Sequence, residues 1–348
     1  MKENDSFEKR KVDHIRLSLD EKSQAQGSGL EDIELVHEAL PSFNLSDVSI
    51  QCSFNKEISL SSPVFISSMT AGHPGSQKIN EALASLSEKR HILMGVGSQR
   101  RQLEQESAVQ EWENIRNKYP GALLMGNIGI SELISTPTDR ILNLMKSIQA
   151  IGFIVHLNPL QEALQPEGNP QFAGALQALE ALKYKSSIPI IIKEVGCGMS
   201  EFTLKKLNQL GIDVIDVSGK GGTHWGRIEG FRNPINSVKS NAAITFADWG
   251  QSTLKSMMNA MNIDMKAELW ASGGVRTGLD VVKLLAMGAK KVGIAQGFLK
   301  AYFETESFES LESYLDQVEF EMRIAMFCCG AQNLDQLTER RVWQWKRN

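Results

Sequence analysis

The chain has 348 residues, of which 42% are apolar and 22% charged, and its 41 acidic and 37 basic side chains give a formal net charge of −4. This balance is typical of a soluble globular protein and excludes a disordered or collagen-like chain. The mildly acidic charge also argues against nucleic acid or an anionic membrane as a partner of the whole surface.

The first residues are hydrophilic, and no run approaches the roughly 18 apolar residues that a membrane span needs. We therefore expect no signal peptide, no membrane segment and a cytoplasmic location. Four cysteines without a Cys-x-x-Cys pair argue against a disulfide framework and against a thiolate zinc site.

Residues 1–60 are polar and irregular. Near the start of this segment, Arg10 and Lys11 precede His14 in a small basic run. Such a run is usually a solvated tail, but it could also fold over the molecule, or reach a neighbouring subunit, to hold an anionic substrate. The pair Arg100–Arg101 is a second candidate for that role.

From residue 61 onward, short apolar runs rich in β-branched residues recur. Each run is uninterrupted rather than alternating, as in strands buried on both faces of a parallel sheet. The eight predicted strands are Val64–Met69, Ile92–Val96, Ala122–Ile128, Gly152–Leu157, Ile188–Lys193, Val214–Ser218, Ala267–Ser272 and Lys291–Ala295.

Segments with helical spacing of apolar residues separate these strands, and Ser200 and Gly211 are expected to cap and end one of them. Eight strand–helix repeats imply right-handed crossovers. They predict an α/β fold, a closed (β/α)8 TIM barrel, with an open doubly wound sheet as the alternative. The predicted parts are an N-terminal polar arm and cap at 1–60, the barrel at 61–300 and a C-terminal helical tail packed on the barrel at 301–348.

The connection between the sixth and seventh strands is unusually long. Its excess lies in 219–242, which is rich in Gly, Asn and charge and precedes a helix-like stretch from Ala243. A long loop after a barrel strand is typically a lid or wall of the active site. Glu229 lies in this loop near His224 and Arg232, so it is either a general acid/base or a solvated carboxylate.

Polar residues follow every predicted strand, at the end where barrel enzymes place their active sites. Two ends, Ser272-Gly273-Gly274-Val275-Arg276 and Ala295-Gln296-Gly297, are typical of the phosphate site in the last two loops of such barrels, although glycine pairs also serve ordinary turns. Lys193 ends a strand made otherwise of Ile and Pro. This position predicts an anionic partner, such as a flavin edge or a phosphate, rather than a solvated loop lysine.

The densest polar cluster follows the fourth strand, where His156, Asn158, Gln161 and Glu162 fall within seven positions. A lone histidine is more often a satisfied core residue, but four polar residues together indicate a functional site. Glu162 is the natural ligand for a divalent cation that also contacts substrate phosphate oxygens, which is the usual Mg²⁺ arrangement.

With these strand ends in place, the sequence resembles the type II isopentenyl-diphosphate isomerases, which are flavoproteins with a (β/α)8 barrel. The resemblance runs from Arg10 to about Gln296. Its motifs are Arg-Lys-x-Asp-His at 10–14, Met-Thr-x-Gly at 69–72, Gly-Ser-Gln-Arg at 97–100, His-Leu-Asn-Pro-x-Gln-Glu at 156–162, Gln-Pro-Glu-Gly-Asn at 165–169, Lys-Glu-Val-Gly-x-Gly at 193–198, Gly-Gly-Thr-x-Trp at 221–225 followed by Glu229 and Arg232, and Ser-Gly-Gly-Val-Arg at 272–276.

The resemblance implies interconversion of isopentenyl and dimethylallyl diphosphate in isoprenoid biosynthesis, with Mg²⁺, with FMN reduced by NADPH or a similar donor, and in a homo-oligomer (tetramer or octamer). The residues implied to line FMN are Ser68, Met69, Thr70, Ser98, Asn127, Lys193, Ser218, Thr223, Gly273, Gly274, Arg276, Ala295 and Gln296. Those implied to meet the substrate are Arg10, Lys11, His14, Ser98, Arg100, His156, Asn158 and Gln161. Glu162 is the implied Mg²⁺ ligand, and the implied catalytic residues are Gln161, Glu229 and His156, with reduced flavin as the acid/base.

One departure from the family and two rival functions stand beside this interpretation. Ala71 occupies a position where the family commonly has glycine, and it restricts a positive φ near FMN. The nearest rival is an FMN-dependent 2-hydroxy-acid oxidase or dehydrogenase, whose pattern resembles His-Gly-Gly-Arg where this chain has Lys220-Gly221-Gly222-Thr223. The other rival is a non-catalytic flavin- or phosphate-binding protein, which would need no Gln161–Glu162 pair. The sequence assigns no role to His224.

Overall fold

A closed ring of eight parallel strands forms the centre of the computed structural model, which describes residues 12–69 and 76–346. In chain order the strands are β4 (Val64–Ile66), β5 (Leu93–Gly95), β6 (Leu123–Gly129), β7 (Gly152–Leu157), β8 (Ile190–Glu194), β9 (Val214–Asp216), β10 (Glu268–Ser272) and β11 (Lys291–Ile294). Each pairs with its neighbour in sequence, and β11 pairs with β4 to close the ring. All eight predicted strands are thus confirmed, and the open doubly wound sheet is excluded because the barrel has no free edge.

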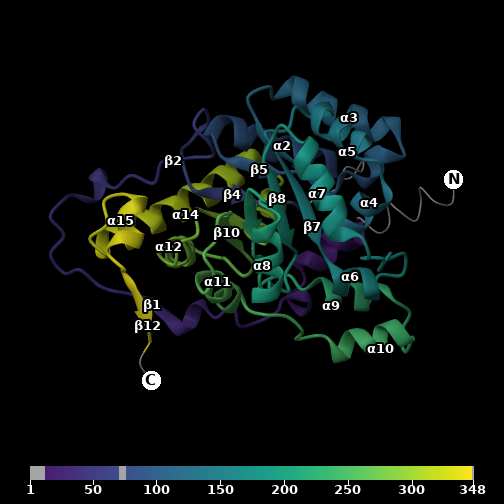
Figure 1. Cartoon of the computed structure of the whole chain (residues 1–348). Helices are drawn as coiled ribbons and strands as arrows, with labels where there is room; N and C mark the ends of the chain where they lie inside the picture. The colour runs from purple at the N-terminus through teal and green to yellow at the C-terminus, as the bar shows by residue number, and fades with distance from the viewer. Residues whose placement is uncertain (1–11, 70–75, 347–348) are drawn as a thin grey trace.

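Helices surround this barrel (Figure 1). Those that follow its strands include α2 (Gln77–Arg90), α3 (Glu106–Lys118), α4 (Ile130–Ser135), α5 (Thr138–Ser147), α6 (Pro159–Leu164), α7 (Ala175–Lys185), α8 (Glu201–Gln209), α11 (Thr253–Met261) and α12 (Gly278–Ala286). The side chain of Ser200 caps α8 by accepting the Thr203 N–H, and Gly211 follows the helix with a φ of 68°. The predicted strand–helix alternation and both helix signals are confirmed.

The long connection between β9 and β10 differs from its prediction as an irregular loop. It contains α9 (Trp225–Arg232) and α10 (Val238–Thr245), whereas the sequence predicts a helix only from Ala243. The first of these helices begins at His224, whose Nδ1 accepts the N–H of Arg227. Histidine is not one of the usual N-cap residues, so the start of α9 carries no standard sequence signal.

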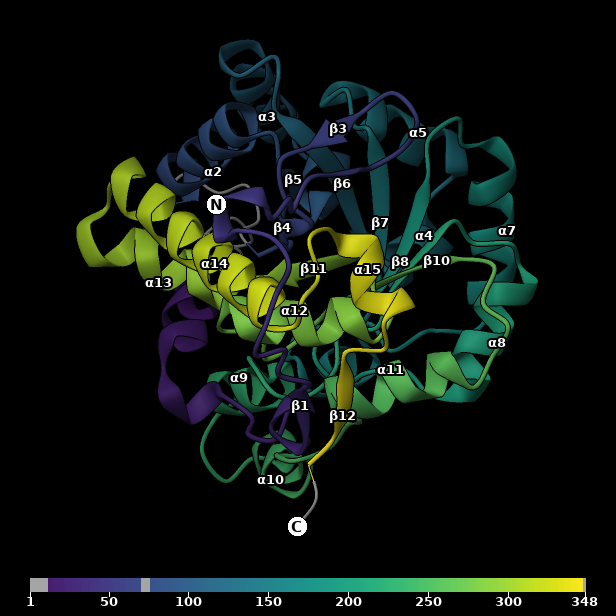
Figure 2. The same cartoon turned by 90° about the vertical axis from the view of Figure 1, so that its left-hand side faces the viewer.

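Segments far apart in the sequence pair outside the barrel. β1 (Ile33–Leu35) runs antiparallel to β12 (Trp343–Trp345), and β2 (Cys52–Ser53) pairs with β3 (Ser59–Leu60). After β11 come α13 (Gln296–Thr305), α14 (Phe308–Cys328) and α15 (Leu334–Glu339), and α14 packs across α12 and α13 (Figure 2). In the described part of the chain, no helix is long and apolar enough to cross a membrane.

The interior of the barrel has an apolar layer and, directly above it, a polar layer. The side chains of a strand that point inward are two residues apart, so one strand can contribute to both layers. The apolar layer consists of Phe65, Leu93, Met125, Ile154, Ile191, Val214 and Trp270, joined by Phe54 and Leu60 from the β2–β3 hairpin. Two residues further along six of these strands stand Ser67, Asn127, His156, Lys193, Asp216 and Ser272. The fold therefore gathers polar side chains at the carboxyl ends of the strands.

Candidate functional site

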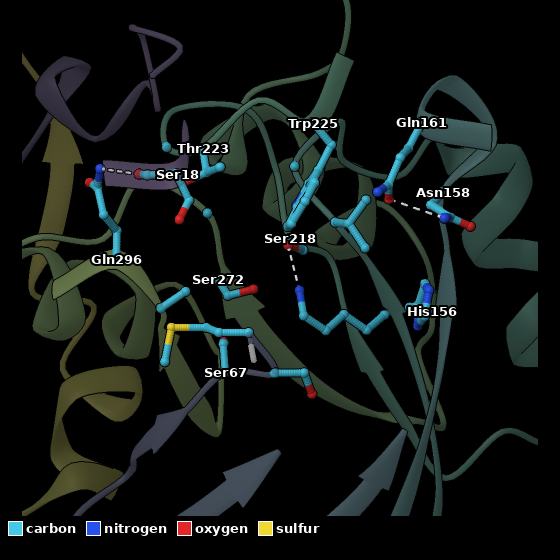
Figure 3. A pocket seen from close by; sticks show the side chains of 18 of the residues that line it. Ser18, Ser67, His156, Asn158, Gln161, Ser218, Thr223, Trp225, Ser272 and Gln296 are labelled. Carbon is cyan, nitrogen blue, oxygen red and sulfur yellow. Dashed lines mark hydrogen bonds between the residues drawn. The ribbon is translucent and has the colours of Figure 1, made fainter. Parts of the chain in front are cut away.

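A pocket opens over the polar layer, and each of the eight strands or the loop after it contributes to its wall. The predicted site residues that line it are His14, Ser68, Met69, Ser98, Arg100, Asn127, His156, Asn158, Gln161, Glu162, Lys193, Ser218, Thr223, Gly273, Gly274, Arg276, Ala295 and Gln296. Figure 3 shows several of these side chains around one cavity. Arg10, Lys11 and Thr70 lie outside the described residues. Among the predicted residues that are described, Glu229 and Arg101 are absent from the pocket wall, and Arg101 pairs with Glu111 at 2.9 Å instead of facing an anion site.

Lys193 is buried at the centre of the polar layer. Its ammonium group donates to Ser218 Oγ at 2.8 Å and to the carbonyl of Glu194 at 2.7 Å, and it lies 3.6 Å from Asp216 Oδ2. Asp216 is fully buried and accepts hydrogen bonds from Ser272 Oγ and from the Ser218 N–H. A single carboxylate therefore balances the charge of the lysine and also holds the two serines beside it.

The end of β10 lets two backbone segments approach each other closely. Gly273 and Gly274 have φ values of 97° and 74°. A Cβ on Gly273 would clash with the carbonyl of Gly219, and one on Gly274 would lie 2.6 Å from the carbonyl of Gly221. Only glycine fits both the dihedral angles and the space at these positions.

The neighbouring end of β11 leads into a helix that has no side-chain cap. Ala295 precedes α13 and supplies no capping atom, so the first backbone N–H groups of this ten-residue helix remain available at the pocket. Gln296 is held in place by donating to the carbonyl of Ser18 at 2.9 Å, as Figure 3 shows. Together with the exposed Arg276, this end of the pocket suits an anion.

Three buried polar atoms in the pocket wall lack a hydrogen-bond partner among the described residues. They are Ser67 Oγ, Ser68 Oγ and Asn158 Oδ1. Buried polar groups in native proteins are nearly always paired, so atoms of this kind in a pocket point to a bound polar molecule. Two of them lie at the end of β4 and one follows β7, which places them on different sides of the cavity.

A chain of hydrogen bonds orients His156. Asn127 Nδ2 donates to the carbonyl of Val96 at 3.1 Å, which leaves Asn127 Oδ1 to accept from His156 Nδ1 at 2.9 Å. Gln99 Oε1 in turn accepts the Asn127 N–H. The proton of the imidazole is therefore held on Nδ1, and Nε2 is the nitrogen that can face a ligand.

Glu162 lies at the start of α6 and is buried. Its Oε1 accepts from Asn158 Nδ2 at 2.8 Å and its Oε2 accepts the Asn169 N–H at 2.7 Å. Burial raises the pKa of Glu162, although both hydrogen bonds oppose that shift. Within the described residues, no group of three or more His, Cys, Asp or Glu side chains could hold a metal ion. A cation at Glu162 would thus need further oxygen ligands from a bound molecule or from water.

Glu229 is neither solvated nor in a loop, because it is fully buried within α9. Its Oε1 accepts from Gln161 Nε2 at 3.1 Å and lies 2.9 Å from His14 Nε2, while its Oε2 pairs with Arg232. Burial would raise the pKa of Glu229, but the hydrogen bond and charge of His14, together with Arg232, lower it overall. Glu229 therefore faces the pocket only through Gln161 and His14.

Several residues that the structure places at the site carry no motif or spacing signal in the sequence. Asp216 and Glu132 are two of them. In the sequence Trp225 stands out only as part of a motif, and in the structure it packs edge-on against the His14 ring at 5.0 Å. Asp216 nevertheless carried a usable signal, because a single acid in the buried run Val214–Ser218 is as unusual as Lys193 in its own strand. His224 also gains a role as the cap of α9, and its Nε2 lies 3.0 Å from the Trp249 carbonyl.

Known proteins resemble this chain in both sequence and fold. An FMN-dependent dehydrogenase family matches residues 155–344, which is more than half of the chain. The isopentenyl-diphosphate delta-isomerase of Bdellovibrio bacteriovorus is 53% identical over 345 residues, covering 98% of this chain and 99% of that protein. Proteins of the same name from Legionella pneumophila (strain Corby) and a Nostoc species are 45% and 38% identical, covering 97% and 94% of this chain and 98% and 93% of their own lengths.

Solved structures share the architecture at low sequence identity. A flavocytochrome b2 variant with benzoylformate superposes with a TM-score of 0.65 at 16% identity, covering 92% of this chain and 77% of its own. A mandelate oxidase variant with an FMN adduct superposes with a TM-score of 0.61 at 14% identity, covering 97% and 92% of the two chains. At this level of identity the likeness concerns the barrel fold alone.

Proposed function

Since the chain belongs to the isopentenyl-diphosphate delta-isomerases, within an FMN-dependent dehydrogenase family, we propose that its pocket interconverts isopentenyl and dimethylallyl diphosphate with reduced FMN and Mg²⁺. The proposal rests on two features that lie in the same cavity. The glycine-lined end formed by β10 and β11 suits a phosphate, and the cluster after β7 suits a metal-bound diphosphate.

The polar layer and the glycine-lined end fit FMN. Gly273, Gly274, Arg276 and the start of α13 would hold its phosphate. Lys193 would lie against the flavin ring, and Ser67 and Ser68 would use their unpartnered hydroxyls on the cofactor. Asn127 lines the same wall, but both ends of its side-chain amide are engaged with Val96 and His156, so we propose that it supports the site mainly by fixing His156.

The opposite wall of the pocket fits the diphosphate. His14, Arg100 and His156 line it, and Arg10 and Lys11 of the same arm would add positive charge. Mg²⁺ would bind Glu162, with Asn158 Oδ1 beside it and diphosphate oxygens completing the coordination. A net charge of −4 is compatible with an anionic substrate because these cations would be concentrated in one place.

Moving a double bond in an unactivated alkene requires adding a proton to one carbon and removing one from another. Reduced FMN supplies the acid–base chemistry for those steps when it is bound. Gln161 would lie at the reacting end of the substrate, where its amide is held in orientation because Nε2 donates to Glu229 and Oε1 accepts from Asn158 Nδ2. Trp225, His14 and the long β9–β10 connection exclude water from the same space.

The position of His224 weighs against the 2-hydroxy-acid oxidase alternative. That chemistry needs a histidine base in the pocket after the sixth barrel strand, which is β9. In this chain His224 is fully buried, caps α9 and contacts the Trp249 carbonyl, and it is not part of the described pocket wall. The Gln161–Glu162 pair likewise exceeds what a non-catalytic flavin- or phosphate-binding protein would need.

We also propose how the chain is divided into parts, what reduces its flavin, how it assembles and where in the cell it acts. We assign residues 1–60 to an N-terminal arm and cap that contributes to the substrate site, 61–300 to the FMN barrel and 301–348 to the tail. Within the first segment the β2–β3 hairpin packs against the apolar layer, so the contribution to the site comes from the residues before it. The contact between His14 and Glu229 supports the role of the arm. We also propose NADPH as the reductant, a tetramer or octamer, and a cytoplasmic location, which four free cysteines support.

An anaerobic assay with isopentenyl diphosphate, FMN, NADPH and Mg²⁺ tests the function. We expect the purified protein to bind FMN and to form dimethylallyl diphosphate, and to lose activity when either FMN or Mg²⁺ is withheld. A fully flavinated protein that forms no product would refute the isomerase. A protein that cannot be loaded with FMN would refute the flavin site.

A further inference from the structure

Glu132 lines the pocket between two proposed substrate-binding residues. It stands in the first turn of α4, directly after β6, and its side chain is only 14% exposed. Its Oε1 lies 3.1 Å from Arg100 Nη1. Of the two side chains, Arg100 is the more flexible, because it is 35% exposed and has a long aliphatic stem. The carboxylate thus fixes one end of an otherwise flexible cation.

The second oxygen of Glu132 lies near the His156 ring, although no hydrogen bond or ion pair joins these two described side chains. A Cβ placed on Gly129 would clash with Glu132 Oε2 and would lie 3.1 Å from His156 Nε2. Both atoms therefore lie beside the Gly129 Cα, and Gly129 pairs directly with His156 in the barrel register. Because His156 Nδ1 is engaged by Asn127, Nε2 is the nitrogen on the side of Glu132.

The backbone conformation at position 129 does not require a glycine. It has a φ of −77° and a ψ of 152°, which any residue can adopt. An added Cβ would clash with the Glu132 carboxylate. Glycine at position 129 therefore leaves room for that carboxylate. The local sequence Gly129-Ile130-Ser131-Glu132 thus seats a carboxylate over the site.

From this geometry we propose that Glu132 is a positioning residue of the substrate site, which holds Arg100 beside His156 so that both can receive the diphosphate. This inference rests on the proposed function for the identity of the ligand. Charge alone argues for the opposite effect, since a carboxylate in the wall of an anion site repels the anion. If repulsion dominates, removing the Glu132 charge tightens diphosphate binding. If Glu132 positions Arg100, its loss weakens that binding.

The test measures binding of inorganic pyrophosphate with Mg²⁺ to the oxidised, FMN-loaded protein by calorimetry. Steady-state constants for isopentenyl diphosphate are measured alongside. In Glu132→Gln we expect the pyrophosphate Kd and the substrate KM to rise about tenfold, the effect of losing one charge-assisted contact, while kcat changes less than about twofold. Gly129→Ala keeps the charge but displaces the carboxylate, so it should shift both constants in the same direction.

Glu201→Gln is the matched control, because it removes a first-turn glutamate, paired with Lys205, from α8 outside the pocket. It should leave Kd and KM unchanged. Unchanged or tighter pyrophosphate binding in Glu132→Gln, with wild-type flavin content, would overturn the proposal. If that variant does not fold, Gly129→Ala decides the matter in the same way. If the wild-type protein does not isomerise the substrate, the proposed function fails, yet the pyrophosphate affinities still decide the role of Glu132.

Discussion

Lys193 and Lys291 are buried lysines inside the same barrel, one in the polar layer and one at the level of the apolar layer. Lys291 is 2% exposed, donates to Glu268 Oε1 at 2.9 Å and lies 5.3 Å from the centre of the Trp270 ring. Lys193 donates to a serine and a carbonyl, and its carboxylate partner is further away, at 3.6 Å. The lower lysine is closed in by an ion pair and an aromatic face, whereas the upper one lines a pocket.

The position of each lysine along its strand accounts for this difference. Lys291 opens β11 at the amino end, and Lys193 stands near the carboxyl end of β8. In this fold the carboxyl ends carry the chemistry and the amino ends carry stability. A buried charged residue therefore indicates a functional role only when it lies at the carboxyl end of its strand.

The largest effect is expected from exchanging the two lysines for methionine. Lys193→Met should reduce isomerase activity by about 10²–10³-fold, because it removes the charge that we propose to face the flavin, while the barrel stays folded. Lys291→Met should leave activity per folded molecule within about twofold. It should change stability by no more than about 2 kcal/mol, since the Glu268 side chain is 35% exposed and can be hydrated.

Activity assays on variants matched for flavin content, together with thermal unfolding, check this pair. Similar losses of activity in Lys193→Met and Lys291→Met would contradict the proposal that only the polar layer serves catalysis.

A smaller but still large effect is expected at Glu162. Glu162→Gln should raise the Mg²⁺ concentration needed for half-maximal activity at least about tenfold, because the amide loses the charge that the cation needs. FMN binding should be unchanged, since this side chain contacts Asn158 and the Asn169 N–H rather than the glycine-lined end. A magnesium titration beside a flavin spectrum makes the measurement. Simultaneous loss of FMN would mean that the damage is structural.

The carboxylate partners of the two lysines sharpen the comparison further. Asp216→Asn leaves Lys193 without a balancing charge, so we expect a more positive flavin midpoint potential and about tenfold lower activity. Glu268→Gln, the matched change in the apolar layer, should leave the potential unaltered. Spectroelectrochemical titration of both variants checks this. Equal potentials in Asp216→Asn and the wild-type protein would show that Asp216 does not tune Lys193.

The smallest effect concerns pH and the cap of α9. Burial lowers the pKa of His224 below its usual value of 6.5, and Nδ1 must stay unprotonated to accept the Arg227 N–H. The stabilisation is therefore present above pH 6.5 and is lost as the pH falls toward the lower folded-state value. The protection factors of amides 225–232, which correct for the slower intrinsic exchange at lower pH, should fall between pH 7 and pH 5 in the wild-type protein by the equivalent of about 1 kcal/mol.

His224→Asn provides the control for this pH effect, because asparagine is a good N-cap that does not titrate in this range. Parallel exchange profiles in the two proteins would contradict the role assigned to His224.

The sequence predicts the barrel because its strands are buried on both faces and leave uninterrupted apolar runs. Lys193, Glu162 and the glycines at 273 and 274 are predictable for a related reason, since they stand where a strand or its helix meets the pocket. Their signal is local, so neighbouring residues suffice to identify the position.

Other site features depend on contacts that span the chain. The sequence leaves Glu229 as either a general acid/base or a solvated loop carboxylate, and its burial depends on a contact with His14, which is 215 positions away. His224 and Glu132 likewise acquire their roles from Trp249 and Arg100, which periodicity cannot place beside them. The helices α9 and α10 escape prediction because one begins at an unusual cap and both are short.

The central claim is that this pocket isomerises the diphosphate without consuming reducing equivalents. The most direct measurement reduces FMN-loaded protein once with light under anaerobic conditions, without NADPH, and follows isopentenyl diphosphate by NMR in the presence of Mg²⁺. We predict that many molecules of dimethylallyl diphosphate form for each flavin and that the flavin is still reduced at the end. Product limited to one molecule per flavin, or no product from a fully reduced protein, would contradict it.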